Sequence, residues 1–474
     1  MTSSTAYVLA DDVILRDEAP YLQSDARFLF LARQALTLYL SASTFETLVF
    51  LTTARIPNQA WEYYLDRCAV NGDVPKRPEF DGFWQALVEM QVLRPSEAGE
   101  RSSRPHSNLG LKPSETCRIQ PMSFPTRVSL VLTARCNLAC KHCLRESSPL
   151  LRGEGELSTE RVLRLMEELD SNGATSIQLS GGEVTVRKDI LEIVDYTRRL
   201  RSHVQFLTNG FVLRPGLIEV LAEVQAAKKQ GFFVHLSLDG GTPATNDWLR
   251  GARAYSRTLS AMESLSKAGV TVVVESCLTP RNIGELELIA NLCLDRGVSQ
   301  LTFHPISYTG RAGCNPLFLP IEAVEQAAST VDALARQFAP AMTIEFGRQF
   351  SPHRRDADDS SLLPANTTGA GMFHMAIGAD GKVCPCIESV GAPSLVMGDV
   401  QADSTSDIWR GPQWDLFRGG WTTDELEGCR GCIFDGRCST QACRCYAVAT
   451  GMGFYSPFRD CYANKHILWG GDGR

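Results

Sequence analysis

The sequence predicts an α/β fold in which parallel strands alternate with helices. From residue 127 onward, short segments rich in Val, Leu and Phe alternate with longer segments whose apolar residues follow helical spacing. Six strand segments are separated by helical segments, several of which end with a Gly just past the last turn. This alternation is typical of parallel βα units, which form either a partial barrel or an open sheet.

The expected strands and helices follow one another along the chain. The strands are RVSLVLT at 127–133, SIQLSGG at 176–182, HVQFLTNG at 203–210, FFVHLSLDG at 232–240, VTVVVESC at 270–277 and SQLTFHPI at 299–306. The helices fall within 158–173, 189–201, 216–231, 256–269 and 282–297. Ligands of such folds bind at the carboxyl ends of the strands, so we expect functional residues in the loops that follow the strands.

Residues 1–95 are expected to form a separate domain. AYVLADDVILR alternates as strands do, whereas TFETLVFL and FWQALVEMQVL carry helical apolar spacing. A small winged-helix-like α+β domain fits this mixture. Residues 96–126 contain several Pro and Ser and no apolar periodicity, which is typical of a linker.

The composition is that of a globular protein without a nucleic-acid or membrane partner. The 474 residues include 44% hydrophobic and 21% charged residues, which excludes a disordered or fibrous chain, and the length suggests about three domains. The net charge of −7 has the wrong sign for a protein that wraps nucleic acid or anionic lipid. No hydrophobic run is long enough to span a bilayer and no secretory signal opens the chain, so we expect a cytoplasmic location.

The 16 cysteines divide into isolated residues and two clusters. Five are scattered singly and are expected to be small buried hydrophobes: Cys68, Cys117, Cys277, Cys293 and Cys314. In a reducing compartment, clustered cysteines indicate metal binding or catalysis rather than disulfides. The first cluster, ARCNLACKHC, places Cys136, Cys140 and Cys143 in the loop after the first barrel strand. Three thiolates can hold three irons of a 4Fe-4S cluster and leave the fourth iron open, whereas structural zinc prefers four closed ligands.

This C-x3-C-x2-C spacing after a first strand resembles the radical S-adenosylmethionine (radical SAM) superfamily. The resemblance implies a partial (β/α)6 barrel over 127–310, with His142 at the position that is usually aromatic. A second match follows the second strand, where Gly181, Gly182 and Glu183 resemble the GGE motif that holds the methionine amino group. Taken alone, Gly-Gly-Glu would be an ordinary tight turn. Its place one βα unit after the cysteines supports the resemblance.

Further residues near strand ends fit the same cofactor site. The cofactor-binding positions that the resemblance implies are Thr208, Asn209, Ser237 and Asp239. Strand spacing puts Ser237 and Asp239 on one face, where related enzymes contact the cofactor ribose. His235 shares this face and His304 ends the sixth strand, but a hydrogen-bonded core histidine explains each at least as well.

The resemblance implies a radical mechanism. S-adenosylmethionine would chelate the open iron, and an electron from an external donor such as flavodoxin or ferredoxin would lead to a 5′-deoxyadenosyl radical that takes a hydrogen atom from the substrate. Glu275, on the fifth strand, is a candidate general base if its side chain points inward. An outward, salt-bridged Glu is the equal alternative.

The second cysteine cluster lies in residues 366–474, after a bridging region at 311–365. GADGKVCPC and GCRGCIFDGRCSTQAC resemble the SPASM extension of radical SAM enzymes, which binds two auxiliary iron–sulfur clusters. The resemblance assigns the outer cluster to Cys429, Cys432, Cys438 and Cys461. A zinc ribbon is the alternative on spacing alone.

Two departures from the SPASM pattern concern the inner auxiliary cluster. The family's C-x5-C-x3-C is C-x5-C-x4-C here, and Thr368 stands where an early cysteine is expected. Two C-x-C pairs then remain: Cys384, Cys386, Cys443 and Cys445. We hypothesise that these four thiolates hold the inner cluster.

The leading hypothesis is a maturase that installs a C–C or thioether crosslink in a ribosomally synthesised precursor peptide. Residues 1–95 resemble the PqqD-like leader-recognition domains of peptide maturases, which take an extended leader as an extra strand. A capping or dimerisation domain is the alternative. Two other functions stay open: a dehydrogenase or epimerase of a small amino sugar or protein side chain, and a non-enzymatic iron–sulfur or zinc scaffold. Leader-dependent turnover and 5′-deoxyadenosine formation discriminate among them.

Overall fold

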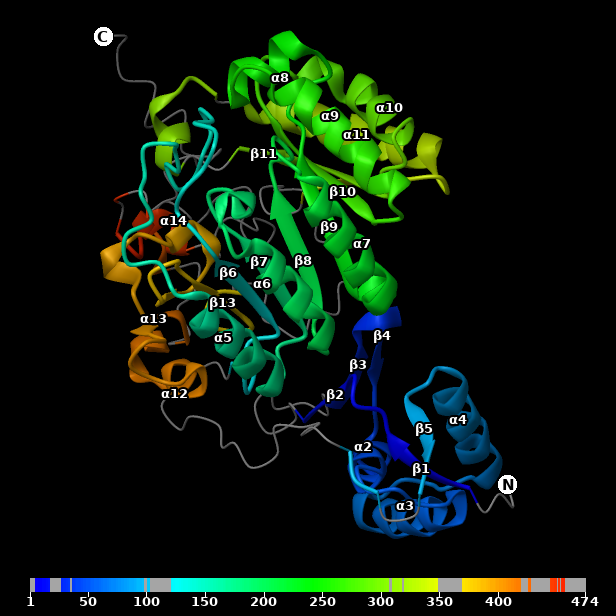
Figure 1. The fold of residues 1–474 in the computed structure, drawn as a ribbon. Helices are drawn as coiled ribbons and strands as arrows, with labels where there is room; N and C mark the ends of the chain where they lie inside the picture. The colour runs from blue at the N-terminus through cyan, green and yellow to red at the C-terminus, as the bar shows by residue number, and fades with distance from the viewer. Residues whose placement is uncertain are drawn as a thin grey trace.

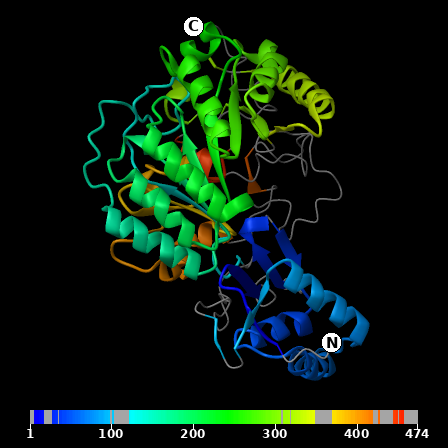
Figure 2. The same cartoon turned by 45° about the vertical axis from the view of Figure 1, so that its right-hand side comes forward.

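The computed structural model shows a small N-terminal part and a larger part built around one sheet (Figure 1). The described residues are 5–17, 27–34, 36–97, 100–102, 121–306, 309–317, 319–347, 369–418, 425–427, 444–449, 451 and 453–456. Each part has a hydrophobic core of its own. Figure 2 shows the same separation from a second direction, with the N-terminal part below the sheet. Within the described ranges, no helix is long and apolar enough to cross a membrane.

The N-terminal part combines strands and helices. A three-stranded antiparallel sheet contains β2 (Val13–Asp17), β3 (Arg27–Leu31) and β4 (Leu36–Tyr39) in that order, and β1 (Ala6–Leu9) pairs with β5 (Leu93–Ser96). Its helices are α2 (Ala42–Phe50), α3 (Pro57–Asn71) and α4 (Arg77–Glu89). The Ser41 side chain caps α2 by accepting a hydrogen bond from the Thr44 N–H. Pro57 is the first residue of α3, a position whose backbone N–H has no partner within a helix, so its missing N–H costs nothing.

One buried arginine joins the N-terminal part to the larger part. Arg16 on β2 is 0% exposed. Its guanidinium donates to the carbonyl oxygens of Phe124 (2.5 Å) and Gly173 (2.9 Å) and to Ser123 Oγ (3.1 Å). A buried charge without partners is costly. These bonds therefore stabilise the β2–β3–β4 sheet in its present position against the larger part.

The large sheet has ten strands in the order β12-β11-β10-β9-β8-β7-β6-β13-β14-β15. The strands are β6 (Arg127–Val131), β7 (Ser176–Ser180), β8 (His203–Thr208), β9 (Phe232–Ser237), β10 (Val272–Leu278), β11 (Gln300–Pro305), β12 (Thr343–Phe346), β13 (His374–Ile377), β14 (Lys382–Cys384) and β15 (Gly398–Asp399). Neighbours from β12 to β13 run parallel. The predicted α/β sheet is therefore confirmed, and β12 and β13 extend it beyond the six predicted strands.

Helices connect these parallel strands in turn. They are α5 (Thr159–Ser171), α6 (Ile190–Tyr196), α7 (Pro215–Lys228), α8 (Pro243–Arg250), α9 (Ala254–Lys267), α10 (Leu286–Leu294) and α11 (Ile321–Phe338). In α5, Ser158 caps the first turn, and the residues at helical spacing are buried: Val162, Leu165, Met166 and Leu169. The C-terminal part adds α12 (Thr405–Arg410), α13 (Asp415–Arg418) and α14 (Arg444–Ala449).

Side chains along the strands alternate between two faces of the sheet. Val204 and Phe206 of β8, for example, pack into the core beneath the helices. Crossovers of parallel strands in sequential order all lie on one side, so the helices cover only that face. The opposite face, which we call the inner face, carries polar side chains: Gln178, Gln205, His235, Ser237, Glu275 and His304.

Candidate active site

The loop after β6 carries the three cysteines of the first cluster. Cys136 is buried, and Cys140 and Cys143 are partly exposed. Burial raises the pKa of the Cys136 thiol to about 12, and the charges of the nearby Cys140 and Cys143 thiolates add to the increase. The three thiols therefore lie within electrostatic reach of one another, as three ligands of one cluster must. Binding of metal replaces the thiol protons, which removes the cost of holding buried thiolates.

Two segments hold this loop from different elements. At the end of α8, the Leu249 carbonyl accepts from the Lys141 N–H (2.9 Å), and the Arg250 carbonyl lies 3.6 Å from Cys140 Sγ. From the segment after β11, Arg311 donates through Nε to the Cys140 carbonyl oxygen (2.8 Å). The cysteine loop is thus held by residues more than 100 positions away in the sequence.

Glu183 of the Gly-Gly-Glu sequence joins the ends of β7 and β8. Its carboxylate is buried and accepts from the Thr185 hydroxyl (2.7 Å), the Thr208 hydroxyl (2.6 Å) and the Asn209 N–H (2.7 Å). Burial raises the pKa of Glu183, and these hydrogen bonds counteract part of the rise. Asn209 also donates to Asn137 Oδ1 in the cysteine loop (2.8 Å). The predicted residues therefore meet beside the cysteines, while a contact of Glu183 with a methionine amino group stays a prediction.

The two glycines before Glu183 pack directly against the backbone that leads into the cysteine loop. A Cβ on Gly182 would lie 2.2 Å from the Arg135 carbonyl oxygen, and one on Gly181 would lie 2.9 Å from the Thr133 carbonyl oxygen. Non-bonded heavy atoms do not approach so closely without strain. The residue type at Gly182 is therefore set by this close approach of two backbone segments.

Asp239 and His142 meet in a buried cluster at the end of β9. The Asp239 side chain accepts through Oδ1 from the Cys277 N–H (2.7 Å), and its Oδ2 lies 2.5 Å from Arg250 Nε and 3.3 Å from His142 Nε2. Burial lowers the pKa of His142 to about 4. Ser237 ends β9 on the inner face, whereas Asp239 lies beyond the strand in this ion pair. A ribose contact through either side chain stays a prediction.

Arg145 brings unpaired hydrogen-bond donors to the same place. Its Nη2 lies 3.3 Å from Ser180 Oγ and also donates to the Gly181 carbonyl oxygen, and its Nε and Nη1 are buried with no hydrogen-bond partner among the described residues. The charges of Cys143 and Glu388 act on this guanidinium. Unpaired buried donors are uncommon in proteins. Three thiols beside a guanidinium with free donors fit an iron–sulfur cluster together with a cofactor that carries a carboxylate.

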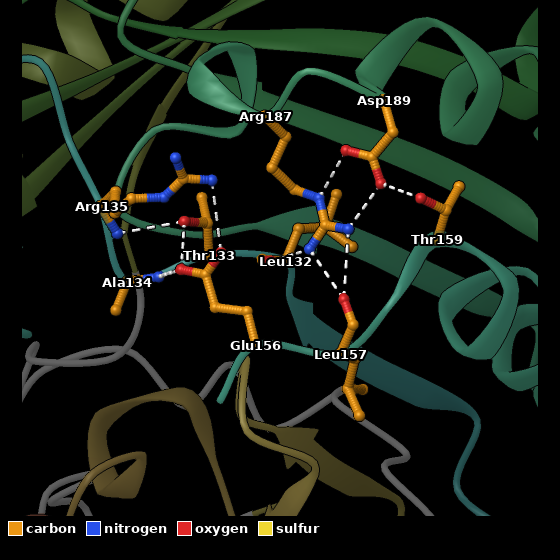
Figure 3. A network of polar contacts seen from close by, with 9 residues as sticks. All are labelled: Leu132, Thr133, Ala134, Arg135, Glu156, Leu157, Thr159, Arg187 and Asp189. Atoms are coloured by element: carbon orange, nitrogen blue, oxygen red, sulfur yellow. Dashed lines mark hydrogen bonds and ion pairs between the residues drawn. The ribbon is translucent and has the colours of Figure 1, made fainter. Parts of the chain in front are cut away.

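A polar network behind the cysteine loop connects it to the segment after Gly-Gly-Glu (Figure 3). Glu156 accepts from the Thr133 hydroxyl (2.6 Å), and the buried Arg187 donates to the Leu132 carbonyl oxygen (2.7 Å) and pairs with Asp189 (2.6 Å). Burial raises the pKa of Asp189, but the Arg187 hydrogen bonds outweigh burial, and the net pKa is below its ordinary value. The network therefore ties the end of β6 to the start of α6.

Glu275 points toward the inner face of the sheet, as the general-base hypothesis requires. Its Oε1 lies 3.0 Å from His235 Nδ1, and its Oε2 lies 3.8 Å from His304 Nε2. Burial raises the pKa of Glu275, but the contact with His235 outweighs burial and lowers this pKa to about 2. The Glu275 side chain is 40% exposed. It is therefore an ionised carboxylate that a molecule at the inner face can reach.

The described cysteines of the second cluster also come together. Cys384 ends β14, and Cys386 follows in the chain. The Cys386 thiol is hydrogen-bonded to Cys445 of α14, and this contact with burial raises the pKa of Cys386 well above its ordinary value. The remaining predicted ligands lie outside the described residues, as does Thr368: Cys429, Cys432, Cys438, Cys443 and Cys461. The proposed ligand set of the inner cluster therefore stays a prediction, with three of its four thiols described.

Three arginines of the site were not found from the sequence. Arg145, Arg250 and Arg311 hold or face the cysteine loop, but none belongs to a recognisable spacing pattern. The one available signal was the position of Arg145, two residues after Cys143. Contacts of the other two depend on the packing of α8 and of the segment after β11.

Comparison with known proteins agrees with this geometry. Residues 130–293 match the radical SAM superfamily, and residues 369–433 match SPASM, an iron–sulfur cluster-binding domain. The chain is 30% identical over 342 residues to the mycofactocin maturase MftC of Mycobacterium ulcerans, covering 72% of this chain and 88% of that protein. It is 27% identical over 358 residues to the antilisterial bacteriocin subtilosin biosynthesis protein AlbA of Bacillus subtilis, covering 73% and 71%.

The overall fold also has a solved counterpart. The crystal structure of Streptococcus suis SuiB bound to S-adenosylmethionine superposes with a TM-score of 0.67 at 14% identity, covering 96% of this chain and 99% of SuiB. The radical SAM family binds S-adenosylmethionine and a 4Fe-4S cluster, and SPASM domains bind auxiliary iron–sulfur clusters. The chain belongs to the radical SAM superfamily, as an enzyme with a SPASM domain.

Proposed function

We propose that this enzyme is a maturase that joins two residues of a ribosomally synthesised precursor peptide through a C–C or thioether bond. The relatives support this, since one is named as a maturase and another as a bacteriocin biosynthesis protein. SuiB, which shares the fold, has been crystallised with its precursor peptide SuiA. The observation that carries the proposal is a free strand edge beside an apolar pocket in the N-terminal domain.

The free edge belongs to β4, which among the described residues pairs with no strand other than β3. This strand is the last in the order β2-β3-β4, and the Leu40 N–H just after it donates to Arg27 on β3 (2.8 Å). Because antiparallel hydrogen bonding alternates, the backbone N–H groups of Thr37 and Tyr39 point away from β3. Both side chains are exposed. An extended leader peptide can therefore add to β4 as a fourth strand.

The pocket next to this edge supplies side-chain specificity. It has a volume of about 240 Å³ and lies between the end of β4 and helices α2 and α4, with Tyr39, Leu48, Phe80 and Trp84 among its lining residues. Alternate side chains of an added strand point to the same face. We therefore propose that one apolar leader side chain occupies this pocket while the leader backbone pairs with β4.

The larger part holds the reactive groups. Cys136, Cys140 and Cys143 would hold the 4Fe-4S cluster, and Arg145 would bind the cofactor carboxylate. When bound, the cluster and S-adenosylmethionine supply the family's chemistry, an adenosyl radical that removes a hydrogen atom from a C–H bond. The chain positions the substrate C–H bond at the inner face and limits water there. Auxiliary clusters on the SPASM cysteines would take up the electron that bond formation releases.

We also propose where the enzyme works and what reduces it. An iron–sulfur enzyme with many free thiols requires a reducing compartment, which supports the cytoplasm. A flavodoxin or ferredoxin there would deliver the electron. No nucleic acid or membrane is needed for this reaction.

The test is leader-dependent turnover by the reconstituted enzyme under anaerobic conditions. Candidate substrates are the peptides encoded by short open reading frames near this gene, and the expected product is a peptide that has lost two hydrogen atoms. Thr37→Pro removes one outward N–H without breaking the β3–β4 hydrogen bonds, so leader binding should fall. Thr37→Val, which keeps the N–H, should bind as the wild type does. Turnover of free amino sugars without any peptide would contradict the proposal.

A further inference from the structure

Three side chains from neighbouring strands form a polar group on the inner face, apart from the cysteine loop and the Gly-Gly-Glu segment. His235 on β9, Glu275 on β10 and His304 on β11 face one another, with Glu275 between the two imidazoles. The strands are in register here, since Glu275 lies opposite Ser237 of β9 and Thr302 of β11. The group is therefore built by the sheet and does not depend on a loop.

The two nitrogens of the His235 ring differ in what lies beside them. Its Nδ1 lies 3.0 Å from Glu275 Oε1 in an ion pair, which places the ring next to the carboxylate. Both nitrogens are buried, and neither has a hydrogen-bond partner among the described residues. A histidine with a purely structural role normally has both nitrogens paired. Because Nδ1 faces the carboxylate, Nε2 is the nitrogen left for a partner that binds at the inner face.

We propose that His235 Nε2 is the proton acceptor of the substrate reaction and that Glu275 is the residue that positions and polarises this imidazole. The inference rests on the proposed crosslinking function and reassigns the base from the carboxylate to the ring. An imidazole held beside a carboxylate is a well-established arrangement for proton transfer. This role also explains why Glu275 is an ionised carboxylate paired with His235. Its negative charge stabilises the imidazolium that forms when His235 accepts the proton.

The proton is accounted for in either crosslink. One substrate C–H hydrogen leaves as an atom to the adenosyl radical. When the new C–C or C–S bond forms, a second hydrogen leaves its carbon or sulfur as a proton, which His235 Nε2 accepts. The remaining electron passes to an oxidant of the iron–sulfur class. Without a proton acceptor the second step stalls after the first has occurred.

The charges around His235 come from several elements. Glu275 faces it from β10, and His304 lies beyond that carboxylate on β11. The charge of His235 in turn reaches His203 on β8, whose pKa burial lowers to about 4. Arg250 acts on Glu275. The nearest of these charged groups is the Glu275 carboxylate. Replacing Glu275 with Gln removes the negative charge beside the ring.

The experiment compares His235→Gln, Glu275→Gln and the control His203→Gln, all reconstituted to equal iron content. His203 lies on the same inner face, packed against Phe233, but makes no contact with Glu275 in the described structure. In His235→Gln, we expect crosslinked peptide to fall about 100-fold or more, while 5′-deoxyadenosine formation and precursor binding persist. The control should keep all three. In Glu275→Gln, kcat for crosslinking should fall while the KM for the precursor stays near its wild-type value.

Each contrary result has a distinct meaning. The inference is overturned if His235→Gln crosslinks the peptide at the wild-type rate. It is also overturned if crosslinking and precursor binding fall equally, because His235 would then act in binding the precursor. If His235→Gln does not fold, a wild-type kcat for crosslinking in Glu275→Gln overturns it. A wild-type enzyme that forms 5′-deoxyadenosine but leaves its precursor unmodified overturns the proposed function itself, and this inference with it.

Discussion

Replacing Gly182 with Ala should damage the radical site although it adds only one methyl group. The added Cβ would lie 2.2 Å from the Arg135 carbonyl oxygen and 2.7 Å from that of Ala134. Favourable packing needs about 3.5 Å or more, so the two segments must separate by roughly 1 Å. The atoms in the way are backbone atoms and cannot rotate aside. The backbone that must move leads directly into Cys136.

The expected cost has two parts. Overpacking of this kind costs about 1–3 kcal/mol of stability, and a displacement of about 1 Å in a reacting group costs about 100-fold in rate. We therefore expect Gly182→Ala to form 5′-deoxyadenosine about 100-fold more slowly. The assay is 5′-deoxyadenosine formation by reconstituted enzyme with dithionite and S-adenosylmethionine, alongside iron content and the electron paramagnetic resonance spectrum of the reduced cluster.

The matched control is Gly216→Ala in α7, where an added Cβ meets nothing within 4 Å. It should leave the cluster spectrum and the rate unchanged. If Gly182→Ala has the iron content, spectrum and rate of the wild type, then the two backbone segments do not pack as the structure has them. The reasoning about the Gly-Gly-Glu segment would then be wrong.

Three further predictions follow from buried groups. Arg16→Met removes three charge-assisted hydrogen bonds between the two parts and should lower the free energy of unfolding by about 3 kcal/mol, measured by urea denaturation. The control Arg164→Met, at an exposed ion pair with Glu160, should change it little. Cys384→Ala combined with Cys445→Ala should lower the iron content by about one 4Fe-4S cluster; unchanged iron would exclude both thiols as ligands. Burial lowers the pKa of His374 to about 3 from 6.5, so the unfolded chain binds the extra proton between these values and stability falls as pH drops below 6.5, by about 2 kcal/mol at pH 5. In His374→Gln, the loss of unfolding free energy between pH 7 and pH 5, measured by urea denaturation, should be smaller than in the wild type by about 2 kcal/mol.

The sequence predicted the features that are local in the chain. Strand and helix periodicity depend on residues a few positions apart, and the six predicted strands are all present. The cysteine spacing and Gly-Gly-Glu are likewise short patterns, and their order after successive strands placed them at one edge of the sheet. By contrast, β12 was not predicted, and the region that contains it was expected only to bridge two domains. Its four residues are too few for their alternation to indicate a strand.

The direction of the inner-face side chains needed the structure. From the sequence, an inward-pointing general base and an outward ion pair were equally good interpretations of Glu275. Only the structure shows that its side chain lies between His235 and His304. The two histidines were explained at least as well as core residues, because sequence does not reveal whether a ring nitrogen is left unpaired. The ribose contact that spacing suggested for Asp239 stays a prediction, and the structure adds a buried ion pair of Asp239 with Arg250 that the strand pattern did not reveal.

By itself, the sequence determined the α/β class, the cysteine motif and the kind of cofactor, since each is written in residues close together in the chain. Only the tertiary structure decided which charges meet at the site. Arg250 reaches Asp239 from α8, Arg311 reaches the cysteine loop from beyond β11, and Arg16 reaches across from the N-terminal domain. These contacts join residues far apart in the chain, and burial sets their strength, so no local pattern encodes them.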